Sequence, residues 1–165
     1  MSAVQDLKSF INRLKKAVNQ SVESKQLKAL GLQAIEHIRI RTRLGYGVKI
    51  SGTSRFKLAA LAPWYKKIRK EYKKDLSEFT TPNKSNLTFS GQMLESMKIL
   101  KIKKNSVLIS PKGRRRKSQL TNEEVAERVS GKRPFNNLSD LEIKKLIRFY
   151  RLNFGDLLKK KKLLK

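Results

Sequence analysis

The sequence predicts an α+β fold in which an N-terminal helix pair and C-terminal helices pack on a small antiparallel sheet. Apolar residues recur at three- and four-residue spacing near both ends of the chain, which is the pattern of amphipathic helices. Near the middle, residues 99–103 and 106–110 alternate apolar and polar side chains, as strands do. A chain of 165 residues has the length of one domain. We therefore expect one domain over residues 1–158 and a basic tail over residues 159–165.

The N-terminal region is predicted to form two helices. Residues 2–20 carry one apolar face, and residues 27–43 repeat the pattern. The polar residues between them favour an antiparallel pair, with one long helix that has a weak centre as the alternative. Gly45 and Gly47 are placed to end the second helix. Ordinary core packing accounts for both apolar faces.

A long extended loop is expected over residues 45–61. This segment has no sustained period and contains three glycines. A loop of that length in a small domain is usually either functional or disordered. A basic loop over residues 112–117 is the densest run of positive charge in the chain. It is either a phosphate hook, a clasp for an acidic subunit or an ordinary solvated loop.

A basic helix is predicted to begin at Pro63, because proline suits the first turn of a helix. Trp64, Ile68 and Tyr72 follow at four-residue spacing among lysines. The interpretation that we favour is that these three side chains pack inward while the lysines stay in water. In the alternative, the aromatic rings are exposed and stack on nucleic-acid bases beside phosphate contacts.

A short helix and two strands should follow. Ser90 can cap the helix, and Phe89 can pack across its first turn. Residues 99–103 and 106–110 are joined by residues 104–105, which suit a hairpin turn. Two strands alone are only marginally stable, so either more strand lies within the loops or neighbouring subunits extend the sheet.

Two helix starts near the C-terminus are marked by the same capping box. Thr121 precedes Glu124 by three residues, and Ser139 precedes Glu142 in the same way. The first box predicts a short helix that ends near Gly131. The second predicts a long C-terminal helix with a broad apolar face, which we expect to cover the sheet.

The composition predicts a polyanionic neighbour. Forty Lys and Arg residues against thirteen Asp and Glu residues give a formal net charge of +27. So much like charge repels itself unless anions or an acidic partner neutralise it. Nucleic acid and acidic protein surfaces both fit this requirement.

Composition also excludes several classes of site. The chain has no cysteine, which excludes disulfides, and its single histidine excludes a multi-histidine metal site. His37 has no nucleophile motif beside it, and the acidic residues near the C-terminus are explained by helix capping. No apolar run reaches the roughly 18 residues that a membrane span requires. We therefore expect a non-enzymatic protein with no cofactor, no metal and no membrane contact.

The order of four sequence segments resembles that of tailed-phage neck and tail-completion proteins. In that family a helix pair precedes a threonine- or serine-glycine element and a strand, and an arginine-proline-phenylalanine link precedes the final helix. The matching segments here, within residues 27–150, are Arg41–Val48, Leu61–Lys70, Ser85–Leu94 and Val125–Asp140. The basic insertion at residues 112–117 and the net charge of +27 depart from the family pattern.

The resemblance implies a structural subunit that joins the portal or an adaptor to the tail around the DNA channel. Such a subunit forms a ring of six or twelve copies, is made in the host cytoplasm and resides in the neck of the virion. A sequence-independent nucleic-acid-binding protein is the alternative, which exposed Trp64 and Tyr72 would favour. A small nuclease is a weaker third reading. Side chains expected to face a neighbouring subunit or DNA are Tyr46, Lys49, Phe56, Lys57, Lys112, Arg114, Arg115, Arg116 and Lys117.

Overall fold

The computed structural model confirms the α+β class. It describes residues 24–49, 52–72, 78, 80–81, 83–88, 90–103, 106–116 and 118–160. Within these ranges lie five helices and two separate antiparallel sheets of two strands each. Several predicted features lie outside the described residues: the helix at 2–20, the packing of Phe89, the turn at 104–105, Lys117, and residues 161–165 of the tail.

The elements follow the predicted order. They are α2 (Ser24–Arg43), β1 (Tyr46–Val48), β2 (Arg55–Lys57), α3 (Pro63–Glu71), α4 (Gln92–Glu95), β3 (Met97–Lys103), β4 (Ser106–Pro111), α5 (Asn122–Ser130) and α6 (Asp140–Lys160). Because α6 continues to Lys160, the tail expected from residue 159 begins inside a helix.

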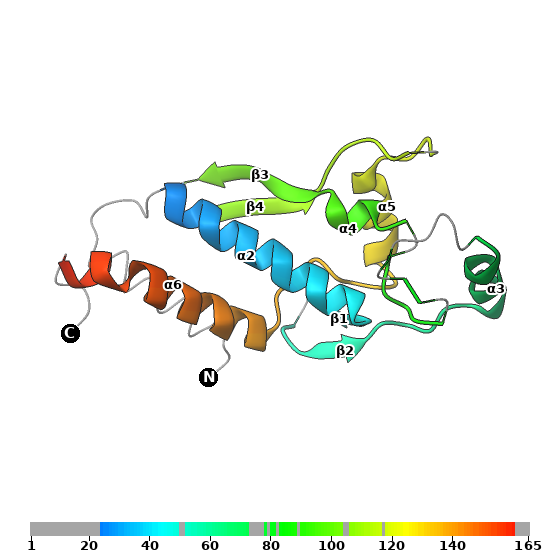
Figure 1. The fold of residues 1–165 in the computed structure, drawn as a ribbon, viewed down its shortest axis with the longest axis horizontal. Helices are drawn as coiled ribbons and strands as arrows, with labels where there is room; N and C mark the ends of the chain where they lie inside the picture. Colours follow the sequence, from blue (N-terminus) through cyan, green and yellow to red (C-terminus); the bar gives the residue numbers. More distant parts are fainter. Residues whose placement is uncertain are drawn as a thin grey trace.

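Helix α2 is the centre of the fold, with β3 and β4 against one side and α6 against another (Figure 1). Gly31 of α2 allows the hairpin to approach closely, since a Cβ there would lie 2.8 Å from Val107 and 3.0 Å from Ile99. The prediction that the C-terminal helix covers the sheet is wrong for α6, which packs on α2. Helix α5 does contact β4.

The main core lies where α2, α4, β3, α5 and the link before α6 meet. Its fully enclosed members include Ile38, Leu94 and Phe135, each with 0% exposure. Arg39 of α2 ties α4 to this core, because its guanidinium donates to the carbonyls of Leu94 and Glu95 at 2.9 and 2.7 Å. These carbonyls lie at the end of α4, where helical partners are missing.

The segment at 45–61 is extended, as predicted, but it contains a short hairpin. Tyr46 pairs with Lys57, and Val48 pairs with Arg55. The alternation of apolar and polar residues that marks a strand could not be recognised in the sequence, because each strand has only three residues. Gly47 holds this hairpin against the rest of the molecule, since a Cβ there would lie 2.3 Å from the Pro134 carbonyl oxygen.

The helix starts near the C-terminus follow the predicted capping boxes. In α5, Thr121 accepts from the Glu124 amide at 3.2 Å while the Glu124 carboxylate accepts from the Thr121 amide at 2.6 Å. In α6, Glu142 accepts from the Ser139 amide at 2.8 Å. The start of α4 differs from prediction, because its cap is Gly91 with a φ of 72° and not Ser90.

The interpretation of α3 that we favoured is wrong. Trp64 is 66% exposed and Tyr72 is 55% exposed, whereas Arg69 is only 1% exposed. Figure 1 shows α3 at one end of the molecule, away from α2 and α6. At that end α3 covers a loop whose carbonyl groups need donors, and Arg69 donates to the carbonyls of Thr81 and Lys84 at 3.2 and 2.7 Å. A polar neighbour therefore selects the arginine for the buried side of the helix.

Candidate functional site

The predicted contact residues do not form one site. Four of them belong to or follow the β1–β2 hairpin, and the other described ones belong to the loop after β4, which Figure 1 places on the opposite side of α2. In the hairpin, Tyr46 and Lys57 are exposed neighbours across the strands. Lys49 is exposed beyond β1, while Phe56 is half-buried beneath Gly47.

The basic loop is held by backbone contacts, which leaves most of its charged side chains exposed. The Gly113 amide donates to Glu123 at 2.9 Å, and the Arg116 amide donates to the Gln92 side chain at 2.7 Å. Arg114 forms an isolated bridge with Thr121. The side chains of Lys112, Arg114 and Arg116 are exposed.

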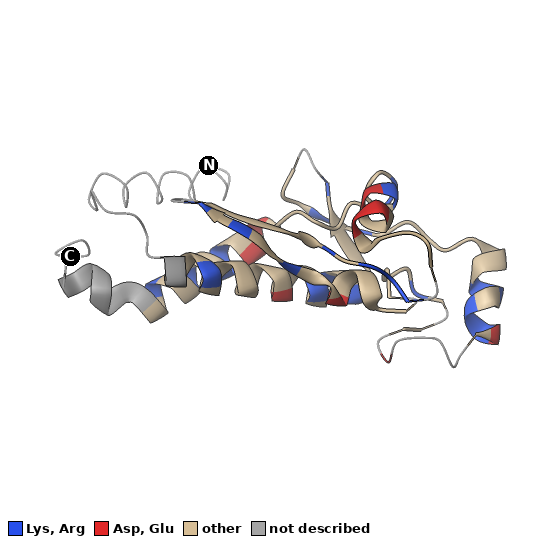
Figure 2. Cartoon of the chain, turned by 90° about the horizontal axis from the view of Figure 1, so that it is seen from above, with Lys and Arg blue, Asp and Glu red and all other residues tan. Residues whose placement is uncertain are grey.

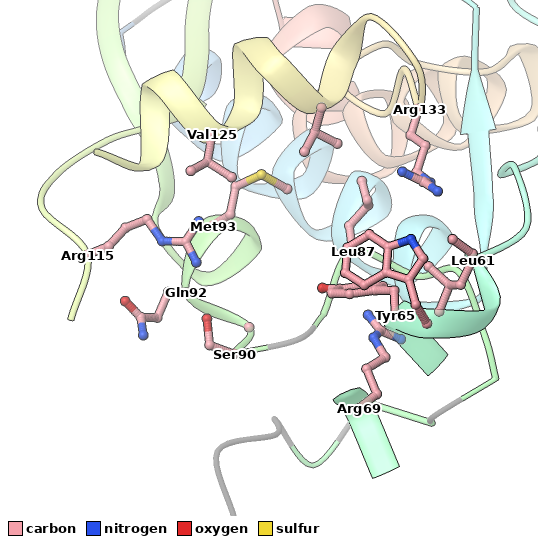
Figure 3. Close-up of a pocket in the computed structure, with 14 residues that line it drawn as sticks. Leu61, Tyr65, Arg69, Leu87, Ser90, Gln92, Met93, Arg115, Val125 and Arg133 are labelled. Carbon is pink, nitrogen blue, oxygen red and sulfur yellow. The ribbon is translucent and has the colours of Figure 1, made fainter. Parts of the chain in front are cut away.

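Arg115 differs from its neighbours because it lines a pocket. Its side chain is half-buried, and its Nε is enclosed without a hydrogen-bond partner. The pocket has a volume of about 320 Å³, within the usual range for ligand sites. It lies between α3, α4, α5 and the loop that precedes α4 (Figure 3).

The pocket combines apolar walls with three guanidinium groups. Its walls are formed by Leu61, Ala62, Trp64, Tyr65, Leu87, Ser90, Gly91, Gln92, Met93, Val125 and Val129, with Arg69, Arg115 and Arg133 among them. None of these lining residues is acidic. Figure 3 shows Arg115 at one end beside Gln92, and Arg69 and Arg133 at the other end near Tyr65 and Leu61.

Two of the three arginines are locked in place by backbone carbonyls. Arg69 lies 5.3 Å from the centre of the Tyr65 ring and keeps an Nε without a hydrogen-bond partner. Arg133 donates to the Ser85 hydroxyl at 3.2 Å and to the Ala60 carbonyl at 3.3 Å. Neutral carbonyls hold these side chains but leave their charge uncancelled, so the pocket has a positive potential.

A second cluster of charge is buried between α2 and α6. Arg41 donates to Glu142 at 2.5 Å and to the Phe135 carbonyl oxygen, and Arg55 lies 3.5 Å from the same carboxylate. Burial lowers the pKa of Arg41, while Glu142 opposes that shift. Glu142 also forms the capping box of α6. The cluster joins α2, α6 and the β1–β2 hairpin.

Clusters of possible metal ligands do not appear in the described ranges. No group of three His, Cys, Asp or Glu side chains there could hold a metal ion. His37 lies half-buried on α2, where burial lowers its pKa below the ordinary value. Among the helices that the structure describes, none has the length and apolar character needed to cross a bilayer.

The β3–β4 hairpin has an unpartnered side. Each of its strands pairs only with the other within the described residues. Ile99 and Val107 face α2, whereas Leu108 is 57% exposed and Leu100 is 38% exposed. The alternation of exposed and half-buried residues from 106 to 109 therefore leaves Leu108 in solvent on β4, which has a free edge among the described strands.

Sequence reasoning missed the pocket and the buried ion pair. Arg115 was predicted only as one member of a basic run, and Glu142 only as a capping residue. The available signal for the pocket was Trp64, whose large ring stands in a helix that is otherwise basic. Comparisons with family models, curated proteins and solved structures gave no match to this chain.

Proposed function

We propose that this chain is a structural subunit of a phage virion neck. In this role it forms a ring between the portal or an adaptor and the tail, around the DNA channel, and catalyses no reaction. It would be made in the host cytoplasm and reside in the virion neck. The order of the four sequence segments supports the proposal, as does the way in which they meet. Arg41 of the first segment binds Phe135 of the fourth, and Arg133 of the fourth binds Ser85 of the third.

The observation that carries the proposal is the half-covered β3–β4 hairpin. Two-stranded sheets are marginal alone, and among the described elements α2 covers one face of this hairpin. A neighbouring copy in a ring can pair with a free strand edge and cover Leu108, in the manner of strand addition. Closed symmetry repeats that contact around the ring and leaves no free end.

The positive charge suits either neighbour expected in such a ring. Figure 2 shows Lys and Arg residues along α2, α3 and the β3–β4 hairpin, with few acidic residues between them. Exposed cations that face the channel attract DNA without reading its sequence. The basic loop at 112–116 is the part that we assign to acidic protein neighbours.

Assembly is the test. Native mass spectrometry and electron microscopy of the purified protein, alone and with portal complex, should show a closed ring of six or twelve copies. Leu108→Lys should prevent ring formation and leave the circular dichroism spectrum unchanged. Leu152→Lys is the matched control, because Leu152 on α6 is 73% exposed and lies away from the hairpin. A protein that stays monomeric under every condition contradicts the proposal.

A second candidate function is sequence-independent nucleic-acid binding, which the exposed rings of α3 favour. Trp64 and Tyr72 are exposed on a helix that also exposes Lys67 and Lys70. Such an arrangement allows base stacking beside phosphate contacts. Because Trp64 is the only tryptophan, its fluorescence reports binding directly. Quenching by oligo(dT) with a steep salt dependence, lost in Trp64→Ala, would establish this function.

A further inference from the structure

We infer that the pocket between α3, α4 and α5 is a docking site for an acidic segment of a different protein, which inserts one apolar side chain and places a carboxylate on Arg115. The inference concerns a site that no predicted contact other than Arg115 reaches. It does not require ring formation, so it can fail or succeed independently of the proposed function.

The apolar walls favour a protein side chain over a nucleotide base. Leu61, Leu87, Met93, Val125 and Val129 offer aliphatic surface on several sides of a volume of about 320 Å³. A base carries polar atoms around its edge, and aliphatic walls would leave those atoms without partners. A leucine or phenylalanine side chain buries only apolar surface in the same space.

The guanidinium groups select the charge of the segment. Arg69, Arg115 and Arg133 line the pocket, and no lining residue is acidic. The Nε atoms of Arg69 and Arg115 are both buried without a hydrogen-bond partner. A buried donor without an acceptor is costly, and a carboxylate is the acceptor that a guanidinium binds best. The geometry therefore suits an anion beside the apolar side chain.

Arg115 is the group best placed to accept that carboxylate. Arg69 is 1% exposed and is already held by the Thr81 and Lys84 carbonyls. Arg133 is held by carbonyls and by Ser85. Arg115 is half-buried and lies at one end of the pocket beside Gln92 (Figure 3). An incoming segment can reach its guanidinium without breaking an existing contact.

The net charge indicates that the segment belongs to another protein. A second copy of this chain has few acidic segments to offer, since its thirteen Asp and Glu residues stand among forty Lys and Arg residues. A partner with acidic residues gains from the positive potential of the pocket. The exposed ring of Trp64, which lines the pocket, supplies an additional apolar contact for such a partner.

The test uses the whole protein and four probes. The first is a nine-residue blocked peptide with a central leucine between glutamates, called the acidic leucine peptide. In the second peptide glutamine replaces the glutamates, and in the third alanine replaces the leucine. The fourth probe is an oligo(dT) of nine nucleotides. Fluorescence of Trp64 measures binding at physiological salt. We expect the acidic leucine peptide to bind about tenfold more tightly than either altered peptide, because each loses one of the two contacts.

Paired variants identify the site. Arg115→Gln should weaken binding of the acidic leucine peptide about tenfold, since a charge-assisted hydrogen bond is lost. Lys144→Gln removes the same charge from an exposed position on α6 that does not line the pocket, and it should change affinity by less than about twofold, because screened surface charges contribute little. Equal losses of affinity in the two variants would mean that the peptide is held only by the overall positive charge of the protein, and this would overturn the inference. Absence of peptide binding, or tighter binding of oligo(dT), would overturn it as well.

Discussion

Glu142 performs two tasks with one carboxylate, and this makes it the most consequential single residue of the fold. Its Oε2 caps α6 through Ser139 and also accepts from Arg41 of α2 at 2.5 Å. Both ionic side chains are almost fully buried, with 1% and 2% exposure. Removing one partner of such a pair leaves the other charge buried without compensation.

Replacing Glu142 by glutamine should therefore destabilise the protein by about 3 kcal/mol, mainly through the uncompensated charge of Arg41. Glu124→Gln is the matched control, because Glu124 holds the equivalent capping position of α5 but is exposed. Denaturant unfolding of the two variants measures the difference. Similar losses in both would mean that capping, and not the ion pair, accounts for the effect of Glu142.

His37 gives the fold a dependence on pH that can be assigned to one residue. Burial lowers its pKa below 6.5, with Lys145 adding to the shift and Glu142 opposing it. The neutral form is thus favoured in the folded state. As pH falls through about 6.5, the unfolded chain takes up the proton first, so folding stability is lost until the folded pKa is passed.

In the variant His37→Gln this loss should be smaller between about pH 7.5 and pH 5.5. The comparison is made by thermal unfolding at both pH values, with the wild-type chain measured in parallel. General repulsion among the cations affects both proteins alike, so only the difference reports on His37. An identical decline in the two would assign the acid sensitivity to other groups.

At the scale of elements, the β1–β2 hairpin depends on one close approach. Gly47 lies so near the link before α6 that an added Cβ would meet the Pro134 carbonyl oxygen at 2.3 Å and Leu58 at 2.8 Å. The neighbouring Val48 amide donates to the same oxygen at 3.1 Å. A side chain at this position must push the hairpin away and break that hydrogen bond.

Gly47→Ala should accordingly cost about 1–3 kcal/mol, the usual cost of overpacking. Gly52→Ala lies in the same hairpin and has nothing within 4 Å of an added Cβ, so it should be nearly neutral or slightly stabilising. Equilibrium unfolding of the pair tests the claim. A neutral Gly47→Ala would show that the hairpin moves freely relative to Pro134.

The elements also show why sequence patterns predicted some features and not others. Capping boxes at Thr121 and Ser139 are local, because each bond joins residues three apart, and both were predicted correctly. The burial of Arg69 in place of Trp64 depends on carbonyls of residues 81–84, which a helical period cannot reveal. The pocket is likewise formed by segments far apart in the chain. The sequence therefore predicted Arg115 as a contact residue but did not reveal that it lines a pocket.

At the scale of the whole molecule, the net charge sets the conditions under which the fold is most stable. Forty basic residues stand against only thirteen acidic residues in the sequence. Figure 2 shows that the described cations lie on several elements. Repulsion among them opposes the compact state and is screened by salt over a Debye length of about 30 Å at 0.01 M and about 8 Å at 0.15 M.

The melting temperature should therefore rise when sodium chloride is increased from about 0.01 M to about 0.15 M, because screening shortens the reach of the repulsion. Most proteins of balanced charge respond weakly to this change, so the direction is informative. Sodium sulfate at equal ionic strength adds two effects to screening, which are anion binding and the general stabilisation that sulfate gives to folded proteins. Only the part of the additional rise that Arg115→Gln removes reports anions held by the arginine-lined pocket. A melting temperature that stays constant or falls as salt is added would mean that the cations are already compensated within the chain. An acidic protein or nucleic-acid neighbour would then not be needed to explain the net charge of +27.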